Sequence, residues 1–349
     1  MAKRIVFCAD GTWNNEATNT NVYKIFKAMN FTAAQCPIYD DGVGSDGGAL
    51  ARFLGGAFGE GLDQKIKEGY TRISHLYEQG DQVFLFGFSR GAYTARSLGG
   101  MIANCGLPTQ NVDDQQTELA FAAYRQRDPA QRQQQLASLK QRYAPDNAQI
   151  AMIGVWDTVG SLGLPAIFGG IDVMRYAFLD TKLHPDVKYA CHAVSIDEKR
   201  REFPATLWDN PVAPDQVIEQ VYFTGVHCDV GGGYPETGLS DITLGWMMTK
   251  AQAHGVDFDP AVYQFYTNLD AKHALDQKHE SWSPRWAPSK LRDIDDHASV
   301  SNSVLMRLQH DASYAPLNLK HATAALAAGY GVVNVVSLPG QTSSAAGTP

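Results

Sequence analysis

A serine inside a tight glycine turn is the residue that points most directly to chemistry in this sequence. The segment Gly87-Phe88-Ser89-Arg90-Gly91 follows a buried apolar run and precedes an apolar-faced helical pattern. Strand, sharp turn and helix form the context that exposes a nucleophilic serine above a sheet. We predict Ser89 as the nucleophile, with Gly87 and Gly91 leaving room for the close approach of strand and helix. The alternative is a serine that caps an ordinary helix.

An activated serine needs a base, and the base needs an acid that orients it. In α/β-hydrolases these groups follow in the order Ser, Asp or Glu, His. Asp157 ends the apolar run 150–156 and is predicted as the acid, with a simple turn aspartate as the alternative. His227 follows the run 217–226 and precedes three glycines, which indicate a sharp loop. We predict His227 as the base and keep His297 as the second candidate.

The other histidines fit a catalytic role less well. His75 precedes the serine in the chain, which is the wrong order. His192 is expected on a helix face with a structural role. Three more are expected to be solvated in polar helical surroundings: His254, His273 and His279.

An oxyanion hole needs backbone donors from two loops. The N–H of Arg90, at a helix N-terminus, is the first predicted donor. Gly11 or Thr12, where the first strand ends, supplies the second. Asp10 is expected to support this turn and Asp229 to support the loop that follows the base.

Two rival chemistries begin at the same residues. The segment ADGTW resembles the DxDGT motif of haloacid-dehalogenase-type phosphatases, but Cys8 stands where their nucleophilic aspartate would be. A metallohydrolase site would combine Asp10, Asp157, His227 and Asp229. That site would leave the serine turn unexplained, so we predict no metal and no cofactor.

The elements that must position these residues alternate along the chain. Apolar or β-branched runs predict strands at 5–9, 83–87, 150–156 and 217–226. Helical periodicity predicts helices at 21–30, 61–79, 93–103 and 241–254. This alternation indicates an α/β fold, with a mainly parallel sheet and helices on both faces. Because the serine turn is typical of α/β-hydrolases, we expect the α/β-hydrolase fold. We expect one domain over residues 1–335, a helical insertion at about 113–145, and a disordered tail over 336–349.

The composition excludes several classes of protein. Of the 349 residues, 44% are hydrophobic and 19% charged, which excludes a disordered chain. A net charge of −8 argues against binding to nucleic acid. No apolar run approaches the roughly 18–20 residues of a membrane span, and the N-terminus does not fit a signal peptide. Five cysteines without a CxxC spacing favour a reducing cytoplasmic location.

Two irregular segments are expected to bind the substrate. The apolar loop 162–170 predicts an acyl pocket lined by Leu164, Ile167 and Phe168. The segment 125–142 is rich in arginine and is expected either to contact anionic head groups or to form a solvated surface.

Taken in order, four motifs resemble a known family: FCADGTWN, GFSRGAYTARSLGGMI, GVWDTVGS and FTGVHCDVGGGY. It is the bacterial α/β-hydrolase domain family, long catalogued as of unknown function, that includes phospholipase effectors of type VI secretion systems. The resemblance spans about residues 4–319 and places the family's triad on Ser89, Asp157 and His227.

The resemblance implies phospholipase A activity on fatty-acyl esters of glycerophospholipids. It also implies peripheral membrane contact, export by a signal-independent secretion system, and a secretion-system or immunity partner. Two alternatives stay open. One is a small-molecule carboxylesterase without lipid activity, and the other is a non-catalytic binding module on a hydrolase fold.

Overall fold

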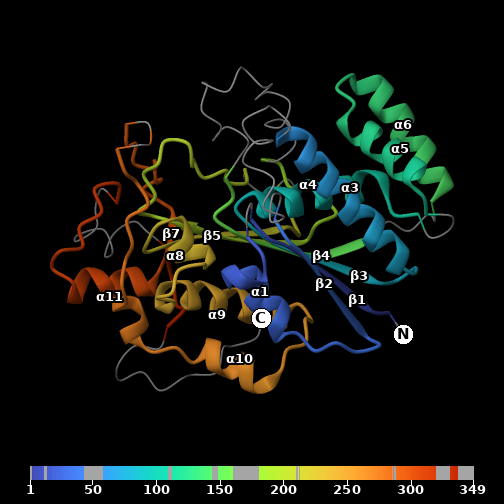
Figure 1. Cartoon of the computed structure of the whole chain (residues 1–349). Helices are drawn as coiled ribbons and strands as arrows, with labels where there is room; N and C mark the ends of the chain where they lie inside the picture. The colour runs from blue at the N-terminus through green and yellow to red at the C-terminus, as the bar shows by residue number, and fades with distance from the viewer. Residues whose placement is uncertain are drawn as a thin grey trace.

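The computed structural model describes residues 2–11, 14–42, 58–108, 112–143, 148–159, 181–209, 211, 213–284, 286, 288–319 and 331–336. Within these ranges, eight strands form one sheet in which every neighbouring pair is parallel (Figure 1). Their order across the sheet is β2-β1-β3-β4-β5-β6-β7-β8. The strands are β1 Arg4–Ala9, β2 Gln35–Asp40, β3 Gln82–Phe88, β4 Gln149–Trp156, β5 Tyr189–Ser195, β6 Val217–Phe223, β7 Ser299–Ser301 and β8 Gly331–Val333.

Helices cover both faces of the sheet, with α3 and α4 on one side and α1 and α9 on the other (Figure 1). The helices are α1 Asn21–Ala28, α3 Phe58–Leu76, α4 Arg90–Cys105, α5 Asp114–Arg125, α6 Pro129–Arg142, α8 His227–Gly231, α9 Gly238–Ala253, α10 Pro260–Thr267 and α11 Asn302–His310. None of the described helices is long and apolar enough to cross a membrane.

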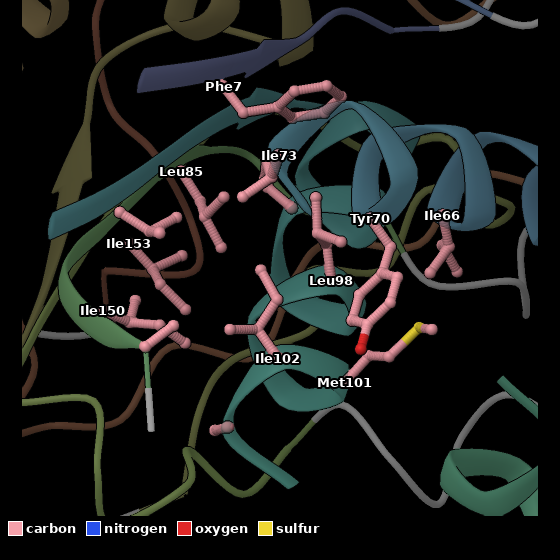
Figure 2. Packing of buried hydrophobic residues seen from close by; sticks show 14 of the residues in the cluster. Phe7, Ile66, Tyr70, Ile73, Leu85, Leu98, Met101, Ile102, Ile150 and Ile153 are labelled. Atoms are coloured by element: carbon pink, nitrogen blue, oxygen red, sulfur yellow. The ribbon is translucent and has the colours of Figure 1, made fainter. Parts of the chain in front are cut away.

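The two cores arise because successive side chains of a strand point to opposite faces. On β1, Ile5 and Phe7 pack toward α3 and α4, whereas Val6 and Cys8 pack toward α1 and α9. Figure 2 shows the first of these cores, where side chains of α3 and α4 meet those of the strands. Burial on both faces explains why the central strands read as continuous apolar runs.

The strand order reverses beside β1. The chain passes from β1 outward to the edge strand β2 and then returns to β3 on the other side of β1. In open parallel sheets, ligands bind at the carboxyl ends of the strands beside such a switch point. Ser89 directly follows β3, and Asp10 directly follows β1. The topology therefore places the serine turn at the position where this class of fold binds ligands.

The α/β fold class, its mainly parallel sheet and its helices on both faces are confirmed. All four predicted strands and all four predicted helices are present, with ends shifted by a few residues. The expectation of a helix at His192 is wrong, because that residue lies in β5. β5 is fully buried and carries cysteine, histidine and serine, so it shows neither alternation nor an unbroken apolar run.

The predicted insertion at 113–145 contains α5 and α6, which pack beside α3 and α4 (Figure 1). Val336, predicted as the first residue of the tail, is buried, and its backbone N–H and C=O both bond to Asn302. Residues 337–349 lie outside the described residues. The extent of a single domain stays a prediction.

Candidate active site

Ser89 occupies a strained turn between β3 and α4. Its backbone has φ 58° and ψ −119°, a conformation that costs free energy for a residue with a side chain. Its N–H donates to the carbonyl of Trp156 on the neighbouring strand (3.1 Å). The flanking glycines make this turn possible. A Cβ on Gly91 would lie 2.1 Å from the carbonyl oxygen of Ala9, and one on Gly87 would lie 2.3 Å from that of Gly91.

Asp157 follows β4 and is also strained, with φ 38°. Only Asn19 shares a positive φ with these two among the described residues other than glycine. Asn19 is of a type that tolerates this region, whereas strain at the other two marks positions that the surrounding structure enforces. The Asp157 N–H donates to the carbonyl of Ala193 (2.8 Å), and the side chain is completely buried.

The Asp157 carboxylate accepts a pair of hydrogen bonds from Arg292. Nη1 reaches Oδ1 at 2.6 Å, and Nη2 reaches Oδ2 at 2.9 Å. Ser195 donates its N–H to the same Oδ1 (2.9 Å). Burial alone would raise the pKa of this carboxyl, but Arg292 and His227 outweigh burial and hold the pKa well below its usual range. Asp157 is therefore an anion at neutral pH.

His227 begins α8 and is held by Asp157. Its Nδ1–H donates to Oδ2 at 2.6 Å, which leaves Nε2 as the acceptor of the neutral ring. The ring packs against Phe88 and Phe203, with centroid distances of 4.6 and 5.2 Å. Burial lowers the pKa of His227, and the bond to Asp157 offsets only part of this effect. The imidazole is therefore kept neutral, as a general base requires.

The glycines after the base are explained by close packing. A Cβ on Gly231 would lie 2.0 Å from the Phe88 ring, so only glycine lets α8 approach the residue beside Ser89. Gly232 and Gly233 have φ of 84° and 113°, which side chains rarely adopt. The predicted sharp loop is confirmed here. It brings the imidazole against Phe88, the direct neighbour of the serine.

The serine and the base are near one another but not bonded. Among the described residues, no hydrogen bond joins Ser89 Oγ to the His227 ring. Such bonds are often long in unliganded hydrolases and tighten around substrate. The roles of Ser89, Asp157 and His227 as one catalytic unit accordingly stay a prediction.

The predicted oxyanion donors are only partly placed. Arg90 is the first residue of α4, where backbone N–H groups point out of the helix end. Gly11 lies against the serine, since a Cβ on it would be 3.2 Å from Ser89 Cβ. Its N–H, however, donates to Asp10 Oδ1 (2.7 Å), so it cannot bind an oxyanion without releasing that bond. Thr12 lies outside the described residues.

Asp10 supports the first turn, as predicted. Besides Gly11, it accepts hydrogen bonds from Thr20 (2.6 Å) and Tyr39 (2.8 Å). Burial raises the pKa of Asp10 to about 6, although these bonds act in the opposite direction. Asp10 thus fixes the loop that faces Ser89 and contacts no other predicted catalytic group directly.

Asp229 and Glu198 support the loop that carries the base. Asp229 accepts from the Val226 N–H (2.9 Å) and from Nδ1 of His279 (2.6 Å). His279 was expected to be solvated, and this expectation is wrong because its ring is largely buried against Asp229. Glu198 is fully buried, and it accepts from the His227 N–H (3.3 Å) and from the Ser281 hydroxyl (2.9 Å).

The rival metal site is not assembled. Asp10 is engaged by Thr20 and Tyr39, and Asp229 by His279, whereas Asp157 is engaged by Arg292. Within the described ranges, no group of three or more His, Cys, Asp or Glu side chains converges on a point that could hold a metal. The predicted acyl pocket residues lie outside the described residues: Leu164, Ile167 and Phe168.

The arginine-rich segment is partly committed to the fold. Arg125 pairs with Asp63 of α3 (3.0 Å), and Arg132 donates to Asn104 of α4 (3.3 Å). These contacts tie the α5–α6 pair to the body of the protein. Lys140 and Arg142 are exposed at the end of α6 and have no ion pair among the described residues.

Sequence reasoning missed Arg292, Glu198 and Ser195. Arg292 is separated from Asp157 by 135 positions and lies in a segment without regular secondary structure, so no local spacing could connect them. The available signal was indirect, because a buried carboxylate at a strand end requires a cation or several donors.

Comparison with known proteins gives one strong match and several weaker ones. A family model described as "T6SS, Phospholipase effector Tle1-like, catalytic domain" matches residues 3–250. "Uncharacterized protein YEL023C" of Saccharomyces cerevisiae is 29% identical over 226 residues, covering 58% of this chain and 32% of that protein.

Two solved structures are also similar to this chain, each at 18% sequence identity. An uncharacterized protein from Pseudomonas aeruginosa has a TM-score of 0.44, covering 75% of this chain and 47% of its own. A Tle1 effector bound to the VgrG spike of a type VI secretion system has a TM-score of 0.43, covering 68% and 52%. The chain thus spans about a third of the curated relative and about half of each solved chain.

Proposed function

Because this chain belongs to the family of Tle1-like catalytic domains of type VI secretion phospholipase effectors, we propose that it is a serine esterase of phospholipase A type. Its substrates are the fatty-acyl esters of glycerophospholipids. The triad consists of Ser89, Asp157 and His227. Delivery by a secretion system and a secretion-system or immunity partner stay predictions.

The observation that carries this proposal is the bond between His227 Nδ1 and Asp157 at 2.6 Å, beside the strained turn of Ser89. An imidazole fixed in this way directs its unprotonated Nε2 away from the acid. Its ring contacts Phe88, the residue that directly precedes the serine. A buried Asp–His pair next to a strained serine at a helix N-terminus is the arrangement that activates a hydroxyl.

The reaction proceeds in two halves. His227 Nε2 takes the proton of Ser89 as Oγ bonds to the ester carbonyl carbon, and the Arg90 N–H stabilises the negative oxygen that forms. The bond from carbon to the leaving oxygen then breaks, and His227 returns the proton to that oxygen. Water repeats the sequence on the acyl-serine and releases the fatty acid.

Ser89→Ala tests this proposal. Removing the nucleophile of such a unit lowers kcat by on the order of 10⁶, and we expect this loss on p-nitrophenyl butyrate and on phospholipid vesicles. Ser74→Ala is the matched control, because that buried hydroxyl on α3 has no hydrogen-bond partner in the part of the chain that the structure describes. A fluorophosphonate probe should label wild type and Ser74→Ala but not Ser89→Ala.

Product analysis separates the alternatives. Mass spectrometry should find free fatty acid and lysophospholipid, whereas cleavage at the phosphate would release a phosphorylated head group. Turnover of the soluble ester alone would indicate a small-molecule carboxylesterase. An unlabelled wild type without turnover would indicate a binding module and contradict the serine mechanism.

A further inference from the structure

A cavity of about 180 Å³ is lined by Phe203, whose ring also packs against the base, His227. The segment that follows β5 and the segment that precedes β7 enclose it. Its lining includes Arg200, Arg201, Phe203, Lys290, Leu291 and Arg292. Pockets that enclose a whole drug-sized ligand are about 300–1,000 Å³, so this cavity suits one compact group rather than a long acyl chain.

The cavity adjoins the predicted triad on the side of its base. Phe203 lines the cavity and also contacts His227, with the two ring centroids 5.2 Å apart and an angle of 75° between the rings. Arg292 joins the cavity to the acid, because it lines the cavity while its guanidinium binds Asp157. In ester hydrolysis the base protonates the departing alcohol, so the alcohol part of the substrate lies on this side of the serine.

The lining carries an excess of positive charge in a protein whose net charge is −8. Two of its cations are matched by buried carboxylates, Arg200 by Glu198 and Arg292 by Asp157. The other two, Arg201 and Lys290, are exposed and have no ion pair among the described residues.

One carboxylate, that of Asp293, also lines the cavity. Counting Arg201 and Lys290 against Asp293 leaves a surplus of one positive charge (2 − 1) among the lining groups that have no ion pair within the described residues. This surplus of positive charge attracts an anion to the cavity.

We propose that this cavity binds the phosphate of the substrate, and that Arg201 and Lys290 make the enzyme prefer phospholipids over neutral lipids. The inference rests on the proposed esterase function. In a glycerophospholipid the phosphate is attached to the same glycerol as the scissile ester, within a few bonds of the oxygen that His227 protonates. Arginine matches a phosphate with two parallel donors, and lysine adds a point charge.

The test compares esters that differ in the phosphate. Wild type and the double variant Arg201→Gln/Lys290→Gln are assayed in the same detergent micelles with phosphatidylglycerol and with diacylglycerol of identical acyl chains. p-Nitrophenyl butyrate is the soluble reference ester. We expect kcat/KM for phosphatidylglycerol to fall about tenfold or more, with the other two esters changed less than about twofold.

A matched control removes two charges elsewhere. Lys27→Gln/Lys188→Gln makes the same charge change at two exposed residues outside the cavity lining and should leave all three activities as in wild type. If this control loses phospholipid activity as strongly as the cavity variant, the effect is one of net charge and the cavity proposal is overturned. Equal losses on all three esters, or no loss on phosphatidylglycerol, also overturn it.

Binding of inorganic phosphate, measured beside the lipid kinetics, shows whether the cavity binds the phosphate of a lipid head group or a free anion. Calorimetric titration of both proteins with phosphate needs no turnover, so it tests the cavity even if no ester is hydrolysed and the proposed function fails. Weaker phosphate binding by the cavity variant together with selective loss on phosphatidylglycerol supports the head-group role. Weaker phosphate binding with unchanged phospholipid kinetics assigns the cavity to a free anion and overturns that role.

Discussion

Among single residues, Arg292 sets the electrostatics of the site. It lies within hydrogen-bond distance of both carboxylate oxygens of Asp157, and it also donates to the hydroxyl of Ser195 (2.7 Å) and to the carbonyl of Phe203 (2.8 Å). A guanidinium here makes Asp157 less basic, so Asp157 stabilises the charged form of His227 less than an unpaired carboxylate would. The pair orients the base, whereas burial is the main cause that lowers the pKa of His227.

The pH dependence of catalysis follows from this pairing. Only the neutral form of His227 can accept the serine proton, and its pKa is below the usual 6.5 because of burial. We expect the acid limb of kcat/KM for p-nitrophenyl butyrate to lie below pH 6.5 in wild type. Arg292→Gln removes a nearby positive charge, so the pKa of His227 rises and the limb moves to higher pH.

Breaking a buried ion pair also costs about 3–5 kcal/mol of folding free energy, so Arg292→Gln is expressed and assayed at low temperature. Arg292→Lys retains the charge and should keep the limb close to its wild-type position even where kcat falls. Circular dichroism establishes that each variant is folded. An acid limb that stays in place in a folded Arg292→Gln protein would contradict this account.

At the scale of elements, the turn from β3 to α4 holds the serine by backbone contact. Gly91 sits directly over the end of β1, where a side chain would strike the carbonyl oxygens of Ala9 and Asp10 at 2.1 and 2.5 Å. Backbone cannot move aside as a flexible side chain can. The first turn of α4 therefore fits against β1 only without a Cβ at this position.

Gly91→Ala is expected to lower the free energy of unfolding by about 3 kcal/mol and to displace Ser89. Gly100→Ala in the same helix is the control, since its Cβ would meet only the hydroxyl end of the Tyr124 side chain, at 2.9 Å. Alanine has a higher helix propensity than glycine, which offsets part of the free-energy cost of the contact with Tyr124. Urea denaturation measures the free energy of unfolding of both variants. Equal losses in the two variants would show that Gly91 is not required by the close approach of α4 to β1.

The elements that sequence reasoning found are those with a strong local signal. β1, β3 and β4 are nearly unbroken apolar runs. Glycines between a strand pattern and a helix pattern indicated the turn at Ser89, and three consecutive glycines indicated the loop after His227. β5 was missed because its burial comes from neighbours on both faces rather than from its own composition. β7 and β8 are three residues each, too short for any period to show. Arg292 was missed because tertiary folding alone brings it to Asp157.

At the scale of the whole molecule, burial of neutral histidine links stability to pH. His192 is completely buried in β5, and its Nε2 accepts the N–H of Thr158 (3.0 Å). Burial, with a smaller contribution from the charge of Arg96, lowers the pKa of His192 to about 3. Below pH 6.5 the unfolded chain takes up a proton at His192 that the folded protein does not. The free energy of unfolding therefore decreases as the pH is lowered from 6.5 to about 3.

His192→Gln removes this proton uptake while retaining an acceptor for Thr158. Between pH 6 and 4 we expect wild type to lose about 1.4 kcal/mol more per pH unit than the variant. Urea denaturation at several pH values measures both slopes. His227 and Asp10 contribute equally in the two proteins and cancel. Parallel slopes would mean that His192 is charged in the folded state.

The segments beyond residue 250 supply hydrogen-bond donors to the buried carboxylates of the site, and residues 3–250, which match the family model, do not contain these donors. The family match ends at residue 250, yet His279, Ser281 and Arg292 lie further along the chain and hold Asp229, Glu198 and Asp157. A truncated enzyme cut at that boundary would keep every reactive side chain and lose the counterion of its acid. Asp157 would then be an uncompensated charge in the protein interior. A shortened version of this protein should therefore extend past Arg292 and not end where the family match ends.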